Sequence, residues 1–323
     1  MNWRNMPISP TLPISPPRWT PGPSGGRRRS SRCCAGEGRM RPPLRAIPLI
    51  LPALLVTIAL LAVPIAQLGV ESLRAYVPGR AGGQGSFTLQ NYADLLAPAY
   101  LFYFYDTLRI GLLVSALALV GGFPIAYLAA RTRRPWLRTV ILGALMALLF
   151  LSMIARLYAM LMAYGPNGPL SAVARALAFG TSEAAYAEIQ VIFGLLHYVL
   201  PVVALMLVGT IQNVDPKMLD AAQTLGAPFW MALAQILVPS ALSGILSAFF
   251  VSFAMCISNF VVPLILGRGV ILFVSNLMYI RFAEVANFPS GAAIGISMLV
   301  LSFALVFGLS ALVRRLLLGR TAG

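Results

Sequence analysis

Acidic residues and histidine are scarce in this sequence. Its 323 residues include nine Asp and Glu and one His, and charged residues of both signs make up only 10%. A soluble domain carries about 25% charged residues, so this chain lacks the polar surface of a water-soluble globule. With 59% hydrophobic residues and a mean hydropathy of +0.83, it is predicted to be an all-α, polytopic integral membrane protein.

Cysteine is also rare, and its placement excludes a disulfide framework. Cys33 and Cys34 are adjacent, Cys256 lies in an apolar run, and His197 has no partner motif. No spacing typical of metal ligands occurs. An intramembrane hydrolase or transferase would need clustered His, Asp, Glu or Ser residues, and a secondary transporter would need ion-coupling acids within its spans. The sequence favours neither class.

The net charge of +15 has a specific distribution. Nine arginines lie in the first 45 residues, and most of the others flank apolar runs. This is how topology determinants are placed, so no nucleic-acid partner is expected. Residues 1–39 are rich in Pro, Arg, Ser and Gly and are predicted to be disordered, either as an over-extended start before Met40 or as a regulatory or lipid-binding arm.

Six apolar stretches are long enough to cross a bilayer, which takes about 20 residues per helix. They are roughly 47–70, 103–130, 139–163, 187–211, 241–266 and 291–313. The segment RTRRPWLR, between the second and third stretches, supplies four arginines. The positive-inside rule therefore predicts that both termini and the 212–240 loop are cytoplasmic. The third loop is expected to form a short amphipathic surface helix carrying Arg175.

The 212–240 loop, which includes NVDPKMLDAAQTLGAP, carries helix start and stop signals. Asp215 suits an N-cap and Pro216 the first helical position. Gly226 is expected to end the helix in a left-handed conformation, and a second helix over 228–238 should end at Pro239. A helix of about ten residues is marginal in water, so it must pack on its own bundle or on a partner.

The same loop resembles a known signature. From Asp220 to Pro239 it reads D-A-A-x3-G-A-x8-I-x-V-P, similar to the E-A-A-x3-G signature of permease subunits of type I ATP-binding-cassette (ABC) importers. The matching residues are Ala221, Ala222, Gly226, Ala227 and Pro239, with Asp220 in place of the usual Glu. The stretches ARLYAMLMAYGPNGPL and NFPSGAAIGISMLVLSFAL look like the polyamine (spermidine/putrescine) branch, and the resemblance covers about residues 85–315.

The resemblance implies a fold and a set of partners. The fold would be the six-helix type I importer permease with a cytoplasmic coupling helix over 216–228, in a bacterial inner membrane. Partners would be ATPase subunits, a second permease subunit, identical or different, and a periplasmic solute-binding protein. ATP would bind the partner, so no cofactor and no catalysis are expected on this chain, and no G-x4-G-K-[ST] motif occurs in it.

The resemblance also divides the chain. The expected parts are a tail over 1–39, a first span with a periplasmic loop over 40–100, a permease core over 101–315 and a cytoplasmic tail over 316–323.

Ionisable residues inside a membrane are functional candidates. Arg156 is a candidate for the solute path, because the matching stretch of polyamine-type permeases carries Arg there; an outward snorkel or an ion pair is the alternative. Tyr158 and Asn259 are further path candidates, with packing or a helix–helix hydrogen bond as their alternatives. A polyamine is the expected solute, and an opine, an amino acid or an iron chelate remains an alternative.

Three further ionisable residues lie near span ends. Asp106 and Arg109 are spaced i,i+3 and are predicted to pair with each other. Glu188 is predicted to be the first-turn acid of the fourth span.

Overall fold

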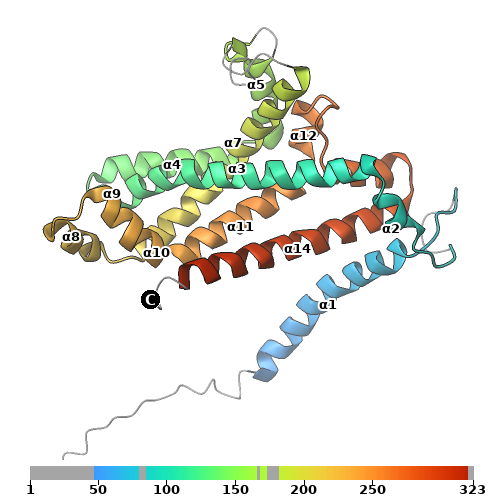
Figure 1. Ribbon diagram of the computed structural model, residues 1–323, viewed down its shortest axis with the longest axis horizontal. Coiled ribbons are helices and arrows are strands. Elements are labelled where there is room, and N and C mark those ends of the chain that lie inside the picture. The colour runs from blue at the N-terminus through green and yellow to red at the C-terminus, as the bar shows by residue number, and fades with distance from the viewer. Residues whose placement is uncertain (1–46, 80–84, 166–167, 173–181, 319–323) are drawn as a thin grey trace, which may run out of the picture. The chain divides into compact units, whose positions relative to one another are not determined.

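The computed structural model describes residues 47–79, 85–165, 168–172 and 182–318 (Figure 1). The chain divides into two units, Met1–Leu55 and Val56–Gly323, and of the first unit only residues 47–55 are described. The predicted tail over 1–39 and the surface helix predicted around Arg175 lie outside the described residues.

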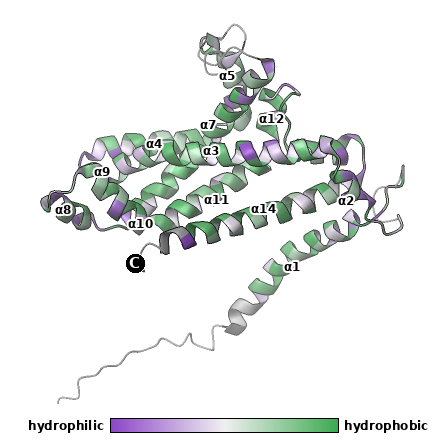
Figure 2. Cartoon of the chain, viewed as in Figure 1, coloured by the Kyte–Doolittle hydropathy of each residue, from purple (hydrophilic) through white to green (hydrophobic). Residues whose placement is uncertain are grey.

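Four helices are long and apolar enough to cross a membrane by themselves. Their spanning parts are Leu54–Ser72 of α1 (Ile47–Ser72), the whole of α3 (Pro98–Arg131) and α7 (Glu183–Gln212), and Phe288–Val313 of α14 (Phe288–Leu318). Two bent helix pairs raise the number of candidate spans to six if each pair is one span. Figure 2 shows hydrophobic residues along most of the long helices and hydrophilic residues on α8. The protein is therefore an all-α membrane protein, as the composition predicts.

Short helices complete the second unit. They are α2 (Gln90–Leu95), α8 (Pro216–Thr224), α12 (Val261–Leu266), α13 (Val274–Tyr279) and the π-helical turn η2 (Ile280–Glu284).

Helices α3 and α7 form the centre of the second unit and contact each other most extensively. Their facing residues are small or β-branched, which lets two helices approach closely in a membrane. The fully buried ones include Val114, Ala118 and Ala126 of α3, and Val191, Val199, Val203 and Ala204 of α7. Gly194 lets α12 approach α7, because a Cβ there would lie 2.9 Å from the Cγ1 of Val262.

The stretch 139–163 is not the single straight span that its length predicts. It forms α4 (Pro135–Phe150) and α5 (Met153–Tyr164), which meet at an angle of 98°. Leu151 and Ser152 have extended backbones at the bend. No proline or glycine marks the bend in the sequence, so helical periodicity alone could not predict it.

The stretch 241–266 is also broken. Helix α11 (Leu242–Ser258) ends where Asn259 adopts an extended backbone, and α12 follows. Before α11, a continuous helix is built from α9 (Phe229–Ala232), the π-helical turn η1 (Leu233–Leu237) and α10 (Val238–Ser240). This helix meets α11 at 75°. The helix predicted over 228–238 is present, but its π-helical turn was not predicted.

The connection from α11 to α14 is fixed by buried polar groups. Asn259 caps α12 by accepting a hydrogen bond from the N–H of Val262 at 3.0 Å. Asn276 donates to the carbonyl of Phe260 at 2.7 Å. The Thr107 hydroxyl accepts from the N–H of Val274 at 2.9 Å and donates to the Tyr103 carbonyl at 2.6 Å. Satisfied buried groups of this kind allow a non-helical backbone to persist between membrane helices.

Replacement of Thr107 by Val should destabilise the protein by about 1–3 kcal/mol, because the buried N–H of Val274 then has no acceptor. Val keeps the shape of Thr, so packing is conserved. The matched control is Thr210→Val, since the Thr210 hydroxyl only donates to the Met206 carbonyl on its own helix. Thermal unfolding in detergent measures both variants. Equal midpoints for the two would contradict the role given to Thr107.

Candidate functional site: helix α8 and its attachment

Helix α8 has a defined beginning and end. The side chain of Asp215 accepts a hydrogen bond from the N–H of Lys217 at 2.9 Å, and Pro216 occupies the first turn. At the other end Gly226 has φ +90°. The N–H of Gly226 bonds the Gln223 carbonyl at 3.0 Å, and the N–H of Ala227 bonds the Ala222 carbonyl at 3.1 Å. This pair of bonds is the Schellman motif, so the start and stop that the sequence predicts are confirmed.

One face of α8 packs against the protein, and another does not. Leu219 is buried and Ala222 is half-buried, against α9 and η1. Met218 is 50% exposed, and Leu225 is 89% exposed. Trp230 of α9 is also 74% exposed. Exposed apolar side chains on a short polar helix are typical of a docking surface.

The segment that contains α8 and α9 contacts α3 at two points. The guanidinium of Arg131, at the end of α3, donates to the Val214 carbonyl at 2.8 Å, just before α8. The ring of Tyr127 contacts the ring of Phe229 edge-on, with centroids 5.7 Å apart. The segment of α8 and α9 is therefore connected directly to a central membrane helix.

The residues of the D-A-A-x3-G motif occupy different environments. Asp220 and Ala221 are exposed on α8, whereas Ala227 is half-buried in the turn. Pro239, which has no backbone N–H, lies in the first turn of α10, directly after the π-helical turn η1. The motif therefore combines surface positions with positions that shape the backbone.

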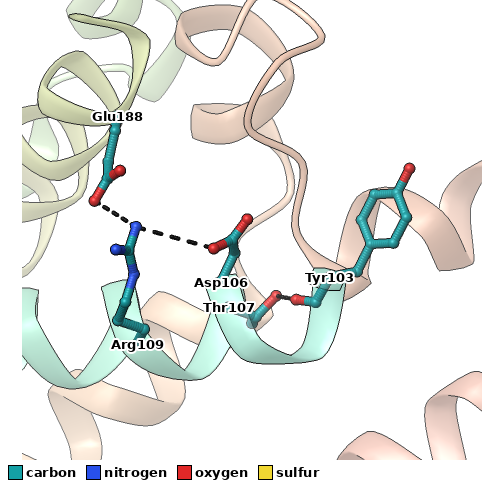
Figure 3. Close-up of polar contacts among 5 residues, drawn as sticks. All are labelled: Tyr103, Asp106, Thr107, Arg109 and Glu188. Carbon is teal, nitrogen blue, oxygen red and sulfur yellow. Dashed lines mark hydrogen bonds and ion pairs between the residues drawn. The ribbon is translucent and has the colours of Figure 1, made fainter. Parts of the chain in front are cut away.

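A second polar cluster lies between α3 and α7 (Figure 3). The guanidinium of Arg109 bonds the carboxylate of Glu188 at 2.6 Å, and Asp106 lies 3.9 Å away on the other side. The predicted pair of Asp106 and Arg109 is present, but the closer partner of Arg109 is Glu188. Glu188 is not the first-turn acid of α7, since Glu183 takes that position after the N-cap Ser182. The cluster combines one cation with two carboxylates, all partly exposed.

Arg156 is 5% exposed and points to the end of α4. Its guanidinium donates to the carbonyl of Leu148, and to that of Leu151 at 3.3 Å. Leu148 lies in the last turn of α4 and Leu151 is its C-cap, so neither carbonyl has an N–H partner within the helix. Tyr158 is 57% exposed. Arg156 thus stabilises the bend after α4, and Asn259 stabilises the bend before α12. A place on the solute path stays a prediction for Arg156, Tyr158 and Asn259.

Comparison with known proteins adds the family. The family "binding-protein-dependent transport system inner membrane component" matches residues 122–318. The spermidine/putrescine transport system permease protein PotB of Haemophilus influenzae is 26% identical over 222 residues, which is 68% of this chain and 77% of that protein. The molybdenum transport system permease protein ModB of Azotobacter vinelandii is 32% identical over 165 residues, 51% of this chain and 71% of that protein.

A solved structure shares the fold. A chain of a bacterial ABC transporter involved in the import of the acidic polysaccharide alginate superimposes with a TM-score of 0.63 at 15% identity, over 84% of this chain and 95% of that chain. The match over 122–318 spans more than half of the sequence. The chain therefore belongs to the binding-protein-dependent transport system inner membrane components, as the non-catalytic, multi-pass permease subunit of an ABC importer that works with an ATPase and a solute-binding protein.

Proposed function

We propose that this permease imports a polyamine such as spermidine or putrescine, and that α8 is its docking point for the ATPase. ATP binds the partner and not this chain. The solute path forms with a second permease subunit, identical or different, and both termini and α8 face the cytoplasm.

The observation that supports the docking role is the exposed apolar surface of Met218, Leu225 and Trp230. Met218 and Leu225 belong to α8, which has caps at both ends, and Trp230 belongs to α9. The segment is attached to α3 through Arg131. A capped helix transmits a displacement, whereas a flexible loop would absorb it. The arginines at the α3–α4 connection support the cytoplasmic placement of this end through the positive-inside rule.

Two observations support a cationic solute. The PotB proteins, by name, transport spermidine and putrescine, and they match two-thirds of this chain. The cluster of Asp106, Arg109 and Glu188 holds one more carboxylate than cation. Glu188 is the closer partner of Arg109, so the carboxylate of Asp106 remains available to attract an ammonium group entering between α3 and α7.

The test is uptake of radiolabelled spermidine by the complete importer in proteoliposomes. The variant Asp106→Asn should raise the KM for spermidine by about tenfold with little change in kcat, because the nearby charge is lost. The control is Glu284→Gln, which removes an exposed carboxylate from η2. An unchanged KM in Asp106→Asn would remove this support for a polyamine path. Transport of an opine, amino acid or iron chelate instead of spermidine would refute the proposed solute.

A further inference from the structure

The connection between α3 and α4 forms an open surface cavity of about 530 Å³. Its lining residues are Thr132, Arg133, Pro135, Arg138, Thr139 and Leu142. Two of the six side chains are cationic, two carry hydroxyl groups, and no carboxylate occurs among these described lining residues. Arg131, the neighbouring arginine, is turned away to the carbonyl of Val214. The cavity is therefore electropositive, because none of its lining residues neutralises the charge of the two arginines.

The backbone adds to this character. Helix α4 begins at Pro135, and the N–H groups of its first turn, at Trp136 and Leu137, have no acceptor within the helix. Such groups attract an anion together with the positive end of the helix dipole. The cavity thus has the chemistry of a site for phosphate oxygens, with two guanidinium groups that can each bind in a bidentate manner.

The surroundings distinguish an amphiphile from a free anion. The cavity extends along α4 as far as Leu142, one helical turn beyond Arg138. Beside it runs an exposed stripe of α4 at helical spacing, which consists of Trp136, Val140, Gly143, Ala147 and Phe150. Gly143 and Ala147 are small, and a Cβ added at Gly143 would meet no atom within 4 Å. The stripe is therefore an uncovered apolar surface that begins next to the cationic cavity.

Trp136 is 61% exposed at the head of this stripe. Tryptophan is enriched at the level of lipid headgroups, because its ring is amphipathic. Trp136 lies between Arg133 and Arg138 in the sequence and so is level with the cationic cavity, and the apolar stripe continues along α4 to Phe150, beyond the cavity. A phospholipid has a matching arrangement, with its phosphate and glycerol region at the membrane surface and its acyl chain extending into the membrane.

We propose that Arg133 and Arg138 bind the phosphate of an anionic phospholipid, one of whose acyl chains lies along the exposed stripe of α4. The lipid would hold the α3–α4 connection at the membrane surface, next to the segment through which α8 is attached to α3. Free phosphate shares the oxyanion chemistry but not the acyl chain, so the two ligands can be separated experimentally.

The experiment is native mass spectrometry of the full-length permease in mild detergent, titrated with phosphatidylglycerol or phosphatidylcholine. The double variant Arg133→Gln/Arg138→Gln should bind phosphatidylglycerol about tenfold more weakly, because two phosphate contacts are lost. The matched control for the single variants Arg133→Gln and Arg138→Gln is Arg134→Gln, which also removes one positive charge but at a position outside the cavity lining. It should change binding by less than about twofold.

Three results would overturn the proposal. The first is unchanged phosphatidylglycerol binding by the double variant at an unchanged thermal midpoint. The second is an equal loss in Arg134→Gln and in the single variants, which would mean that only the overall charge of the loop matters. The third is complete displacement of the lipid by millimolar inorganic phosphate, which would identify a free-anion site. Retention of phosphatidylglycerol by the wild type in the presence of phosphate, and its loss only in the double variant, would support the lipid site.

Discussion

Replacement of Gly226 by Val should lower solute uptake by the assembled importer by at least about tenfold while the ATPase activity falls much less. Gly226 ends α8 at φ +90°, a conformation that costs an L-residue about 1–2 kcal/mol. The cost is higher for a β-branched side chain. The Schellman bonds of Gly226 and Ala227 would be lost, and α8 would no longer lead into α9 at a fixed angle. ATP hydrolysis would continue without moving α3.

The matched variant is Gly226→Asn. Asn has nearly the volume of Val but tolerates the left-handed conformation. It should therefore keep most of the uptake. A Cβ at this position meets no atom within 4 Å in this chain, so the difference between Asn and Val reports the backbone and not a clash. Uptake and phosphate release are measured on the same proteoliposomes. Normal transport by Gly226→Val would show that the coupling assignment is wrong, and equal losses in both variants would contradict the backbone explanation.

Replacement of Arg156 by Met should lower the thermal midpoint of the protein by about 3–6 °C, which corresponds to a loss of about 2–4 kcal/mol. The carbonyls of Leu148 and Leu151 would lose their donor. A bilayer offers no water to replace it. The positive charge that favours the C-terminal end of α4 would also be removed. Arg156→Lys keeps the charge but reaches fewer carbonyls, and an intermediate midpoint is expected.

The control is Arg315→Met, which removes an exposed arginine from the last turn of α14. Its midpoint should change little, because exposed charges at helix ends contribute less than about 1 kcal/mol. Scanning calorimetry or a tryptophan-fluorescence melt in detergent measures all three variants. A normal midpoint for Arg156→Met together with a loss of uptake would contradict the structural role and place Arg156 on the solute path.

The sequence predicts the features of this protein that arise from neighbouring residues. The caps of α8 depend on Asp215, Pro216 and Gly226, all within one short segment, and the structure has them at the expected positions. Five of the six apolar stretches fall on the four long helices and on the pair of α4 and α5, because hydropathy depends on composition alone. The remaining stretch, 241–266, covers α11 and α12, whereas the bent pair in this part of the chain joins Phe229–Ser240 to Leu242–Ser258.

Features that join distant residues could not be predicted in this way. The partner of Arg109 is Glu188, 79 positions away, and the acceptor of the Val274 N–H is Thr107, 167 positions away. The bend after Phe150 depends on Arg156 reaching back to carbonyls of α4, and a linear apolar pattern contains no sign of it. The exposure of Met218 and Leu225 likewise depends on which side of α8 meets α9, which the sequence pattern left open.

The π-helical turn η1 lies where a displacement of α9 would be converted into a rotation of α10. A π turn winds more residues than an α turn, and each residue of an α-helix accounts for about 100° of rotation and about 1.5 Å of rise. Leu233–Leu237 lies between α9, whose Trp230 is on the docking surface, and α10, which leads into α11. Rewinding this turn as an α-helix would rotate α10 about its axis by up to about 100°, the rotation of one residue. It would shift α10 along the axis by only about 1.5 Å. A displacement of α9 that rewinds η1 would therefore rotate the segment that leads into the membrane helix α11.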